Sequence, residues 1–229
     1  MSHTEKDIIQ NLSIDCVVFG FENSRMEVLL IKRKREPEKD KWALPGGFIL
    51  KNESLDSAAV RILEETSNVK NIYLEQVHTF GEVDRYPTRR VITIAYYALI
   101  DPDKHSLKPG IDTTDVQWFP INNLPETPFD HKTILNTALD KLRKQVRTEP
   151  VGFELLPKKF TLTQLQMLYE SILGMKMDKR NFRKKILGLK ILIALEEHQK
   201  SVAHRAARLY KFDTKRYKTL SEQGFNFEL

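Results

Sequence analysis

The chain of 229 residues has a single cysteine, Cys16, and therefore cannot form a disulfide within one copy. It also lacks any run of about 18 apolar residues, the length that a membrane-spanning helix requires. The first segment, MSHTEKDIIQNLSIDC, is polar and has no apolar core of the kind found in secretion signals. These absences predict a protein with no membrane partner that works in a reducing, cytoplasmic setting, where Cys16 is a buried and inert thiol.

An excess of positive charge is present, but only in the last third of the chain. The whole sequence has a formal net charge of +6. Residues 1–150 carry 21 Lys and Arg against 23 Asp and Glu, whereas residues 151–229 carry 16 against 8. Such a basic segment fits a polyanion partner, and it fits a solvated basic face equally well.

Apolar spacing in the first part of the chain predicts strands interrupted by two helices. Helical spacing occurs at 54–66, where Ser54 is the expected N-cap, and at 129–147. Strand-like runs occur at 12–22, 26–34, 72–81, 90–100 and 116–121. The charged stretch 36–47, which contains Pro and Gly, is expected to be a loop. This order predicts a mixed α/β or α+β domain over residues 1–149.

A second domain is predicted over residues 150–229, after a linker-like stretch at 147–157. Its first helix has Thr161 or Thr163 as the expected N-cap and Gly174 as its stop.

A second, shorter helix is expected to begin after Asp178. Its apolar side chains form one stripe: Phe182, Ile186 and Leu189. Residues 190–197 and 206–212 then have the pattern of a β-hairpin. Helix, short turn, helix and hairpin is the order of a winged helix-turn-helix.

The polar side chains of this second domain are candidates for contacts with double-stranded DNA. Off the apolar stripe of the short helix lie Lys179, Arg180, Asn181, Arg183, Lys184 and Lys185, which can reach base edges or phosphates. The N-terminus of the preceding helix suits a phosphate and offers Thr161, Thr163 and Gln164. The hairpin adds Lys200, His204, Arg205 and Arg208. Together with the basic charge, these residues predict DNA binding.

In the first domain, the segment GGFILKNESLDSAAVRILEETSNV at residues 46–69 resembles the Nudix box, G-x5-E-x7-R-E-U-x-E-E-x-G-U, in which U is aliphatic. Without gaps, the matching positions are Gly47, Glu53, Arg61, Leu63, Glu65 and Val69. Ile62 and Thr66 stand where the box has glutamates, and Asn68 stands where it has glycine.

These departures bear on catalysis. Nudix enzymes hold Mg²⁺, a cation that requires oxygen ligands, on the helix face shared by positions 62, 65 and 66. Only Glu65 carries a carboxylate there. Shifting the frame by one residue would add Glu64 but would still leave position 62 without a ligand. We therefore expect no enzyme activity, no catalytic residue, no metal site and no cofactor. The alternative is a Mg²⁺-dependent hydrolase that uses Glu53, Glu64 and Glu65.

The matching positions also have a purely structural interpretation. Glu53 and Arg61 can form an ion pair that ties the loop to the helix, and Gly46 and Gly47 can simply shape the turn.

Across nearly its whole length, the chain resembles the Nudix-related transcriptional regulators, which comprise NrtR regulators of NAD metabolism and arabinose-type AraR regulators of Bacteroides relatives. The likeness lies in YLEQVHTFGEVDRYPTRRVITIAYYALI and in FELLPKKFTLTQLQMLYESILGMKMDKRNFRKKIL. The resemblance implies an α+β protein with an N-terminal Nudix-like α/β/α sandwich, built on a mixed sheet, and a C-terminal winged helix-turn-helix. It also implies a homodimer that represses genes at palindromic operators and releases DNA when its catalytically silent Nudix-like domain binds an effector.

The effector implied by the resemblance differs between the branches: ADP-ribose or a related nucleotide in the NAD branch, and L-arabinose in the sugar branch. The NAD branch usually has Asp-Arg-Asp-Pro-Arg after the Phe-Gly pair, whereas this chain has DRYPTR at 84–89. The missing charged residues argue against a phosphorylated ligand. A neutral sugar would need hydroxyl acceptors and an aromatic face.

We therefore expect a sugar effector closest to the arabinose branch, with ADP-ribose or an NAD-related nucleotide as the alternative. The candidate effector-binding residues are Gly46, Gly47, Phe80, Glu82, Asp84, Arg85 and Tyr86. A simpler interpretation is that EVDRYPTRR is an exposed connection between two strands.

Overall fold

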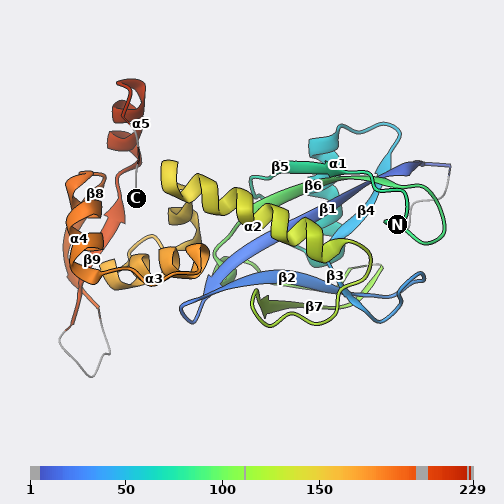
Figure 1. The fold of residues 1–229 in the computed structure, drawn as a ribbon, viewed down its shortest axis with the longest axis horizontal. Helices are drawn as coiled ribbons and strands as arrows, with labels where there is room; N and C mark the ends of the chain where they lie inside the picture. Colours follow the sequence, from blue (N-terminus) through green and yellow to red (C-terminus); the bar gives the residue numbers. More distant parts are fainter. Residues whose placement is uncertain (1–5, 111, 200–205, 226, 228–229) are drawn as a thin grey trace. The chain divides into compact units, whose positions relative to one another are not determined.

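The computed structural model describes residues 6–110, 112–199, 206–225 and 227 (Figure 1). The chain forms two compact units. The first comprises the residues up to Glu22 together with Met26–Lys141, and the second comprises Asn23–Arg25 together with the residues from Leu142 onward.

The described part of the first unit is built on a seven-stranded mixed sheet. Its strands are β1 (Ile8–Glu22), β2 (Arg25–Arg33), β3 (Trp42–Ala43), β4 (Gly46–Leu50), β5 (Glu75–Phe80), β6 (Ile92–Leu99) and β7 (Thr113–Pro120). Strand β1 runs parallel to β6 and antiparallel to β4. Strand β2 is antiparallel to β3 and β7, and β5 is antiparallel to β6. A short 3-10 helix, η1 (Pro102–Lys104), follows β6.

Helices cover both faces of this sheet, with α1 (Leu55–Ser67) behind it and the first turns of α2 (His131–Thr148) in front of it (Figure 1). Alternate residues of β1 and β6 face α1 and form its core, among them Ile14, Cys16 and Ile94. The predicted α/β/α sandwich with a mixed sheet is therefore confirmed.

Local signals correctly placed helix α1. The side chain of Ser54 caps the helix by accepting a hydrogen bond from the Ser57 amide at 3.2 Å. The helix ends at Asn68, which has the left-handed φ of 62° that short polar residues tolerate.

Cys16 is buried and free, and burial raises the pKa of its thiol, as expected of an inert side chain.

The prediction of a loop over residues 36–47 is wrong in part. Residues 42–43 pair with β2 as strand β3, and β4 begins at Gly46 and pairs with β1. The charged residues, Pro and Gly of this stretch argue locally against strands, but pairing with β2 and β1 overrides that local preference.

The second unit has the winged helix order that the sequence predicts. It contains η2 (Pro150–Leu155), α3 (Leu162–Leu173), α4 (Lys179–Gly188), β8 (Leu192–His198), β9 (Arg208–Phe212) and α5 (Thr214–Glu222). Thr161 is the N-cap of α3, within a reciprocal capping box with Gln164. Gly174 ends α3 with φ of 68°, and Asp178 caps α4. Strands β8 and β9 form an antiparallel hairpin.

Three details of the second unit differ from expectation. The stretch 147–157 is not an extended linker: α2 continues to Thr148, and η2 buries Phe153, whose ring stacks on Phe212 with centroids 4.5 Å apart. Leu189 lies just beyond α4 and is half-buried, so it does not extend the buried stripe of Phe182 and Ile186. Helix α5 had no sequence prediction. The domain boundary at residue 149 stays a prediction.

Among the described residues, we find no helix with the length and apolar character needed to cross a membrane.

Candidate effector site and DNA-binding surface

Position 62 of the Nudix-like helix α1 faces the core. The Ile62 side chain is 2% exposed and packs in the cluster between α1 and the sheet. It lies beneath Gly47, where an added Cβ atom would be 3.3 Å from Ile62 Cγ1. Position 62 thus contributes only apolar packing.

Thr66 is equally unsuited to hold a metal ion. The residue is buried, and its hydroxyl donates a hydrogen bond to the main-chain carbonyl of Ile62 at 2.7 Å. This bond within the helix directs the hydroxyl to the backbone of the preceding turn.

The two box glutamates that remain, Glu53 and Glu65, are both bound to Arg61. The Arg61 Nε donates to Glu53 Oε2 at 2.8 Å, and its Nη1 donates to Glu65 Oε2 at 2.9 Å. A further bond, from Nη2 to the carbonyl of Phe48, ties the helix to β4. Hydrogen bonding to Glu53 raises the pKa of Arg61. The structural interpretation of Glu53 and Arg61 as an ion pair is confirmed.

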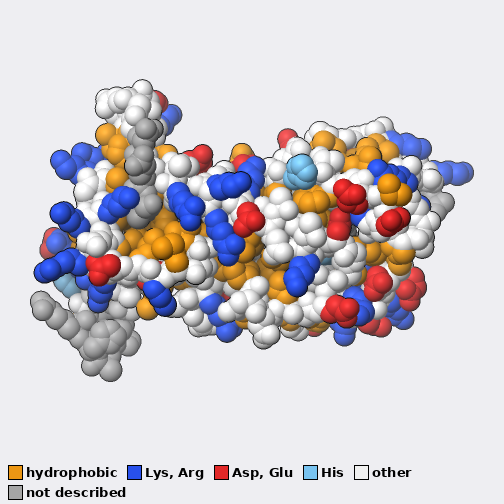
Figure 2. Space-filling view, in the orientation of Figure 1, with side chains coloured by type: hydrophobic (Ala, Val, Ile, Leu, Met, Phe, Trp, Pro, Cys, Tyr) orange, Lys and Arg blue, Asp and Glu red, His pale blue; other side chains and the backbone are white. Residues whose placement is uncertain are grey.

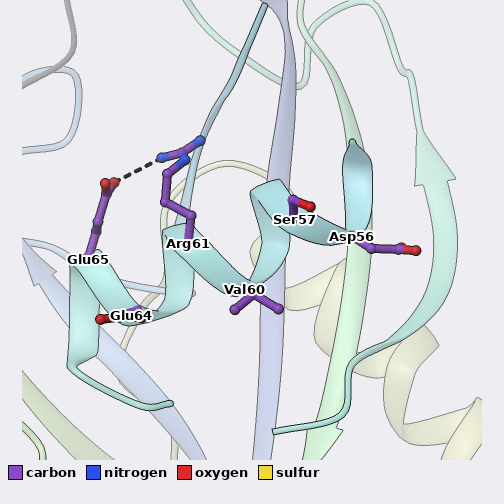
Figure 3. A pocket seen from close by; sticks show the side chains of 6 residues that line it. All are labelled: Asp56, Ser57, Val60, Arg61, Glu64 and Glu65. Carbon is purple, nitrogen blue, oxygen red and sulfur yellow. Dashed lines mark hydrogen bonds and ion pairs between the residues drawn. The ribbon is translucent and has the colours of Figure 1, made fainter. Parts of the chain in front are cut away.

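A shallow hollow lies along the outer side of α1 (Figure 3). Its lining residues are Asp56, Ser57, Val60, Arg61, Glu64 and Glu65. Figure 3 shows Arg61 and Glu65 turned toward each other, whereas Glu64 points away, and Glu64 pairs with Lys70 at 2.7 Å. Within the residues that the structure describes, no group of three His, Cys, Asp or Glu side chains could hold a metal ion.

On the other face of the sheet, the loop between β5 and β6 inserts a charged side chain into the protein. We call residues 81–91 the β5–β6 loop. Arg85 in this loop is 7% exposed. Its Nε and Nη2 donate to both oxygens of Asp130 at 2.9 and 2.7 Å, and Nη2 lies 3.4 Å from Asp15 Oδ2. The guanidinium is therefore occupied by two carboxylates.

Asp15 and His131 complete this buried polar network. Asp15 Oδ2 also accepts a hydrogen bond from the Thr93 hydroxyl at 2.8 Å, and its Oδ1 lies 3.6 Å from His131 Nε2. The Nδ1 atom of His131 accepts from the Leu44 amide at 3.0 Å. Burial lowers the pKa of His131, in agreement with a neutral ring that accepts at Nδ1.

Most of the predicted effector-binding residues lie on or beside this face of the sheet, as does Gly46 opposite Asp15, whereas Gly47 faces Ile62 on the α1 side. Phe80 and Tyr86 are half-buried, Glu82 and Asp84 are exposed, and Arg85 is buried. Tyr86 stacks on Phe129, with ring centroids 5.0 Å apart. Their role in binding an effector stays a prediction.

Sequence reasoning missed several residues of the same region. Phe48, Ser13, Thr93 and Phe80 pair in one row across β4, β1, β6 and β5, so their side chains share a face. The guanidinium of Arg89 lies over the Phe48 ring, 4.5 Å from its centroid.

Sequence reasoning also missed the three partners in the buried polar network, Asp15, Asp130 and His131. The available signal was an aspartate within the apolar run IDCVVFGF, because buried carboxylates require partners.

The predicted DNA-binding residues of α4 are mostly free to contact a partner. Lys179, Arg180, Asn181, Lys184 and Lys185 are exposed, while Phe182 and Ile186 bury the opposite side. Arg183 is half-buried, and its Nη2 donates to the Thr163 hydroxyl on α3 at 3.2 Å. Its Nε is buried and has no hydrogen-bond partner among the described residues. On the face drawn in Figure 2, Lys and Arg side chains gather over the second unit.

The remaining residues predicted to contact DNA either form hydrogen bonds within the second unit or lie outside the described residues. The Thr161 hydroxyl accepts from the Gln164 amide at 3.1 Å, and Gln164 Oε1 accepts from the Thr161 amide at 2.8 Å, so both side chains cap α3. Arg208 donates to the Leu195 carbonyl at 2.7 Å and to Glu196 across the hairpin. Lys200, His204 and Arg205 lie outside the described residues.

Known proteins match both units. The NUDIX domain family matches residues 10–138, and the family described as NrtR DNA-binding winged helix domain matches residues 152–212. The ADPR responsive transcriptional repressor NtrR of Acinetobacter baylyi is 30% identical over 220 residues, which cover 94% of this chain and 85% of that protein.

Solved structures agree with this likeness. The crystal structure of Shewanella oneidensis NrtR complexed with a 27mer DNA has a TM-score of 0.75 and 30% identity, over 88% of this chain and 93% of that one. The NUDIX domain of the same NrtR complexed with ADP ribose has a TM-score of 0.54 and 31% identity, over 62% of this chain and 94% of that one.

Proposed function

Because the chain belongs to the NrtR-type family, in which a Nudix domain precedes an NrtR winged helix domain, we propose that it is a transcriptional repressor whose operator binding is relieved by ADP-ribose. The likeness to one repressor responsive to ADP-ribose over 94% of this chain is the observation that carries the proposal.

Helix α4 supplies the DNA-reading surface of this repressor. Phe182 and Ile186 anchor one side of the helix, and Arg180, Asn181 and Lys184 are exposed on the other. Arg and Lys recognise guanine edges, and Asn recognises adenine. The surrounding Lys side chains contact phosphates, which position the protein without reading sequence. Two copies bind a palindromic operator as a homodimer.

The effector is ADP-ribose rather than the sugar that the sequence suggested. Both the curated repressor and the solved NUDIX domain are named with this nucleotide, and neither is named with L-arabinose. Tyr86 and Thr88 stand where the NAD branch has Asp and Arg. These two replacements do not exclude a nucleotide ligand, because the same loop retains Arg89 and Arg90. Guanidinium groups of this kind suit a diphosphate.

The Nudix domain senses its ligand without hydrolysing it. Ile62 and Thr66 present no carboxylate, and Glu53 and Glu65 are engaged by Arg61. A Mg²⁺ cluster therefore lacks its ligands on this helix. Incubation with Mg²⁺ or Mn²⁺ and ADP-ribose is expected to release no AMP. Metal-dependent release of AMP would establish a hydrolase instead.

Fluorescence anisotropy tests the repressor directly. Labelled fragments from upstream of the protein's own and neighbouring genes are titrated at several salt concentrations, with ADP-ribose, NAD or L-arabinose. We expect tight binding to one palindromic fragment, a steep loss of affinity with salt because counterions are released, and relief by ADP-ribose alone. Relief by L-arabinose alone would restore the sugar assignment, and binding that is independent of salt would contradict DNA recognition by α4.

A further inference from the structure

Arg85 and Asp130 join the β5–β6 loop to the start of helix α2. We propose that this pair is the coupling element through which an effector on the Nudix domain changes the DNA affinity of the winged helix. The inference rests on the proposed function and identifies the positioning residues behind its regulation.

The pair holds the loop to the helix rigidly. Arg85 uses two nitrogens on the two oxygens of Asp130, at 2.9 and 2.7 Å, and the Arg85 side chain is only 4% exposed. Separating the pair is costly, because it would leave the mostly buried Asp130 carboxylate without its guanidinium partner. The proposed coupling requires two states of this contact, formed and broken.

A second contact lies beside the first. The Tyr86 ring stacks on Phe129, the residue that precedes Asp130, and Phe129 has a left-handed φ of 56°. Two consecutive loop residues thus hold the two residues directly before α2. Any ligand that displaces the β5–β6 loop acts on both contacts at once.

Helix α2 can transmit such a displacement. It begins at His131 in the first unit and ends at Thr148 in the second, without Pro or Gly inside it. Asp130 belongs to its first turn, since the Ile134 amide donates to the Asp130 carbonyl at 3.0 Å.

The far end of α2 is bonded to the DNA-binding helices. Arg143 Nε donates to the carbonyl of Ile172 at 2.9 Å, in the last turn of α3. Val146, one turn further along α2, is fully buried in the same unit. Helix α3 is bonded in turn to α4 through Thr163 and Arg183. Within the second unit, these two hydrogen bonds connect α2 to α4 by way of α3.

The β5–β6 loop also borders the row of side chains that a ligand on this face would meet. Thr93 belongs to that row and bonds Asp15, which is the other carboxylate beside Arg85. Arg89, in the same loop, covers Phe48 at the opposite end of the row. A ligand that reaches Phe48 displaces the guanidinium of Arg89, which belongs to the same loop as Arg85.

The test measures coupling separately from either binding event. Full-length wild-type protein and the Asp130→Asn variant are titrated with ADP-ribose by calorimetry. Each protein is then titrated with the operator by anisotropy, with and without saturating ADP-ribose. The substitution keeps the shape of the side chain but removes its charge. Glu126→Gln is the matched control, because it removes the charge of an exposed carboxylate that lies shortly before α2 and pairs with Lys41.

We expect wild type and Glu126→Gln to lose operator affinity with ADP-ribose by a factor in the usual allosteric range of about 5 to 150. Asp130→Asn should bind ADP-ribose and the free operator within about threefold of wild type, yet lose operator affinity with ADP-ribose by less than about threefold. A purely structural role would instead lower both affinities and leave their ratio unchanged.

The outcomes separate the two proposals. Loss of ADP-ribose binding in Asp130→Asn, or an unchanged coupling factor, overturns the coupling role of the pair. A wild-type protein that does not respond to ADP-ribose overturns the proposed function itself. Should Asp130→Asn fail to fold, Asp130→Glu decides, because Glu keeps the charge but its longer side chain shifts the carboxylate from the position that accepts both Arg85 bonds.

Discussion

The carboxylate of Asp15 occupies the space that a side chain at position 46 would need. Asp15 and Gly46 pair across β1 and β4, and a Cβ atom at position 46 would clash with Asp15 Oδ1. Packing therefore requires a glycine at position 46. The absence of a side chain there leaves room for the buried Asp15 carboxylate, which accepts a hydrogen bond from Thr93 and faces Arg85.

Replacing this glycine should destabilise the Nudix domain. Gly46→Ala is expected to lower the free energy of unfolding by about 1–3 kcal/mol, because the added methyl group displaces the Asp15 carboxylate from its partners. Thermal unfolding followed by circular dichroism measures the change. Gly188→Ala is the control, since a Cβ there meets no atom within 4 Å and alanine favours the helix. Equal effects of the two substitutions would contradict the packing role.

The Arg61 ion pairs should contribute more stability than an exposed pair in the same domain. Arg61→Ala breaks bonds to Glu53, Glu65 and the Phe48 carbonyl, and we expect a loss of about 1–3 kcal/mol. Lys41→Ala removes a solvent-exposed pair with Glu126 and should leave the unfolding midpoint nearly unchanged. A midpoint in Arg61→Ala equal to that of Lys41→Ala would show that Arg61 is dispensable for the fold.

Stability should fall as the solution becomes mildly acidic. Burial lowers the pKa of His131 below the value of about 6.5 that the unfolded chain has. The unfolded state then binds a proton that the folded state does not, so the stability contributed by the neutral ring is complete above about pH 6.5 and decreases as the pH falls toward the lowered pKa.

Unfolding of wild type and His131→Gln between about pH 5 and pH 8 isolates this effect. Gln can still accept the hydrogen bond from the Leu44 amide but does not titrate. The decline in that interval should be shallower in the variant, with His105, whose pKa is also lowered by burial, responsible for part of what remains. Parallel curves for the two proteins would contradict a neutral, buried His131.

Arg180 and Arg183 should differ in their effects on DNA binding. Arg180 is exposed, so Arg180→Ala is expected to reduce discrimination between operator and random DNA by about 1–3 kcal/mol without changing the fold. Arg183 bonds Thr163, so Arg183→Ala should also lower the stability of the winged helix. Lys132→Ala, in the first unit, removes the same charge from an exposed site and serves as the control. Undiminished selectivity in Arg180→Ala would exclude Arg180 as a base-reading residue.

The amino-acid sequence by itself determined the elements that depend on neighbouring residues. Ser54, Thr161, Gly174 and Asp178 mark helix ends through bonds or backbone angles within one turn, so their roles were predictable. The absence of carboxylates at positions 62 and 66 and the basic outer face of α4 were equally visible.

Only the tertiary structure decided how the polar groups are used. Arg85 reaches Asp130 across 45 positions and Asp15 across 70, and no local pattern connects residues so far apart. For the same reason β4 resembled a loop until its pairing with β1 was known. A local pattern specifies which side chains a segment carries, but burial and long-range contacts determine whether a charge is free to bind a ligand or already has a partner.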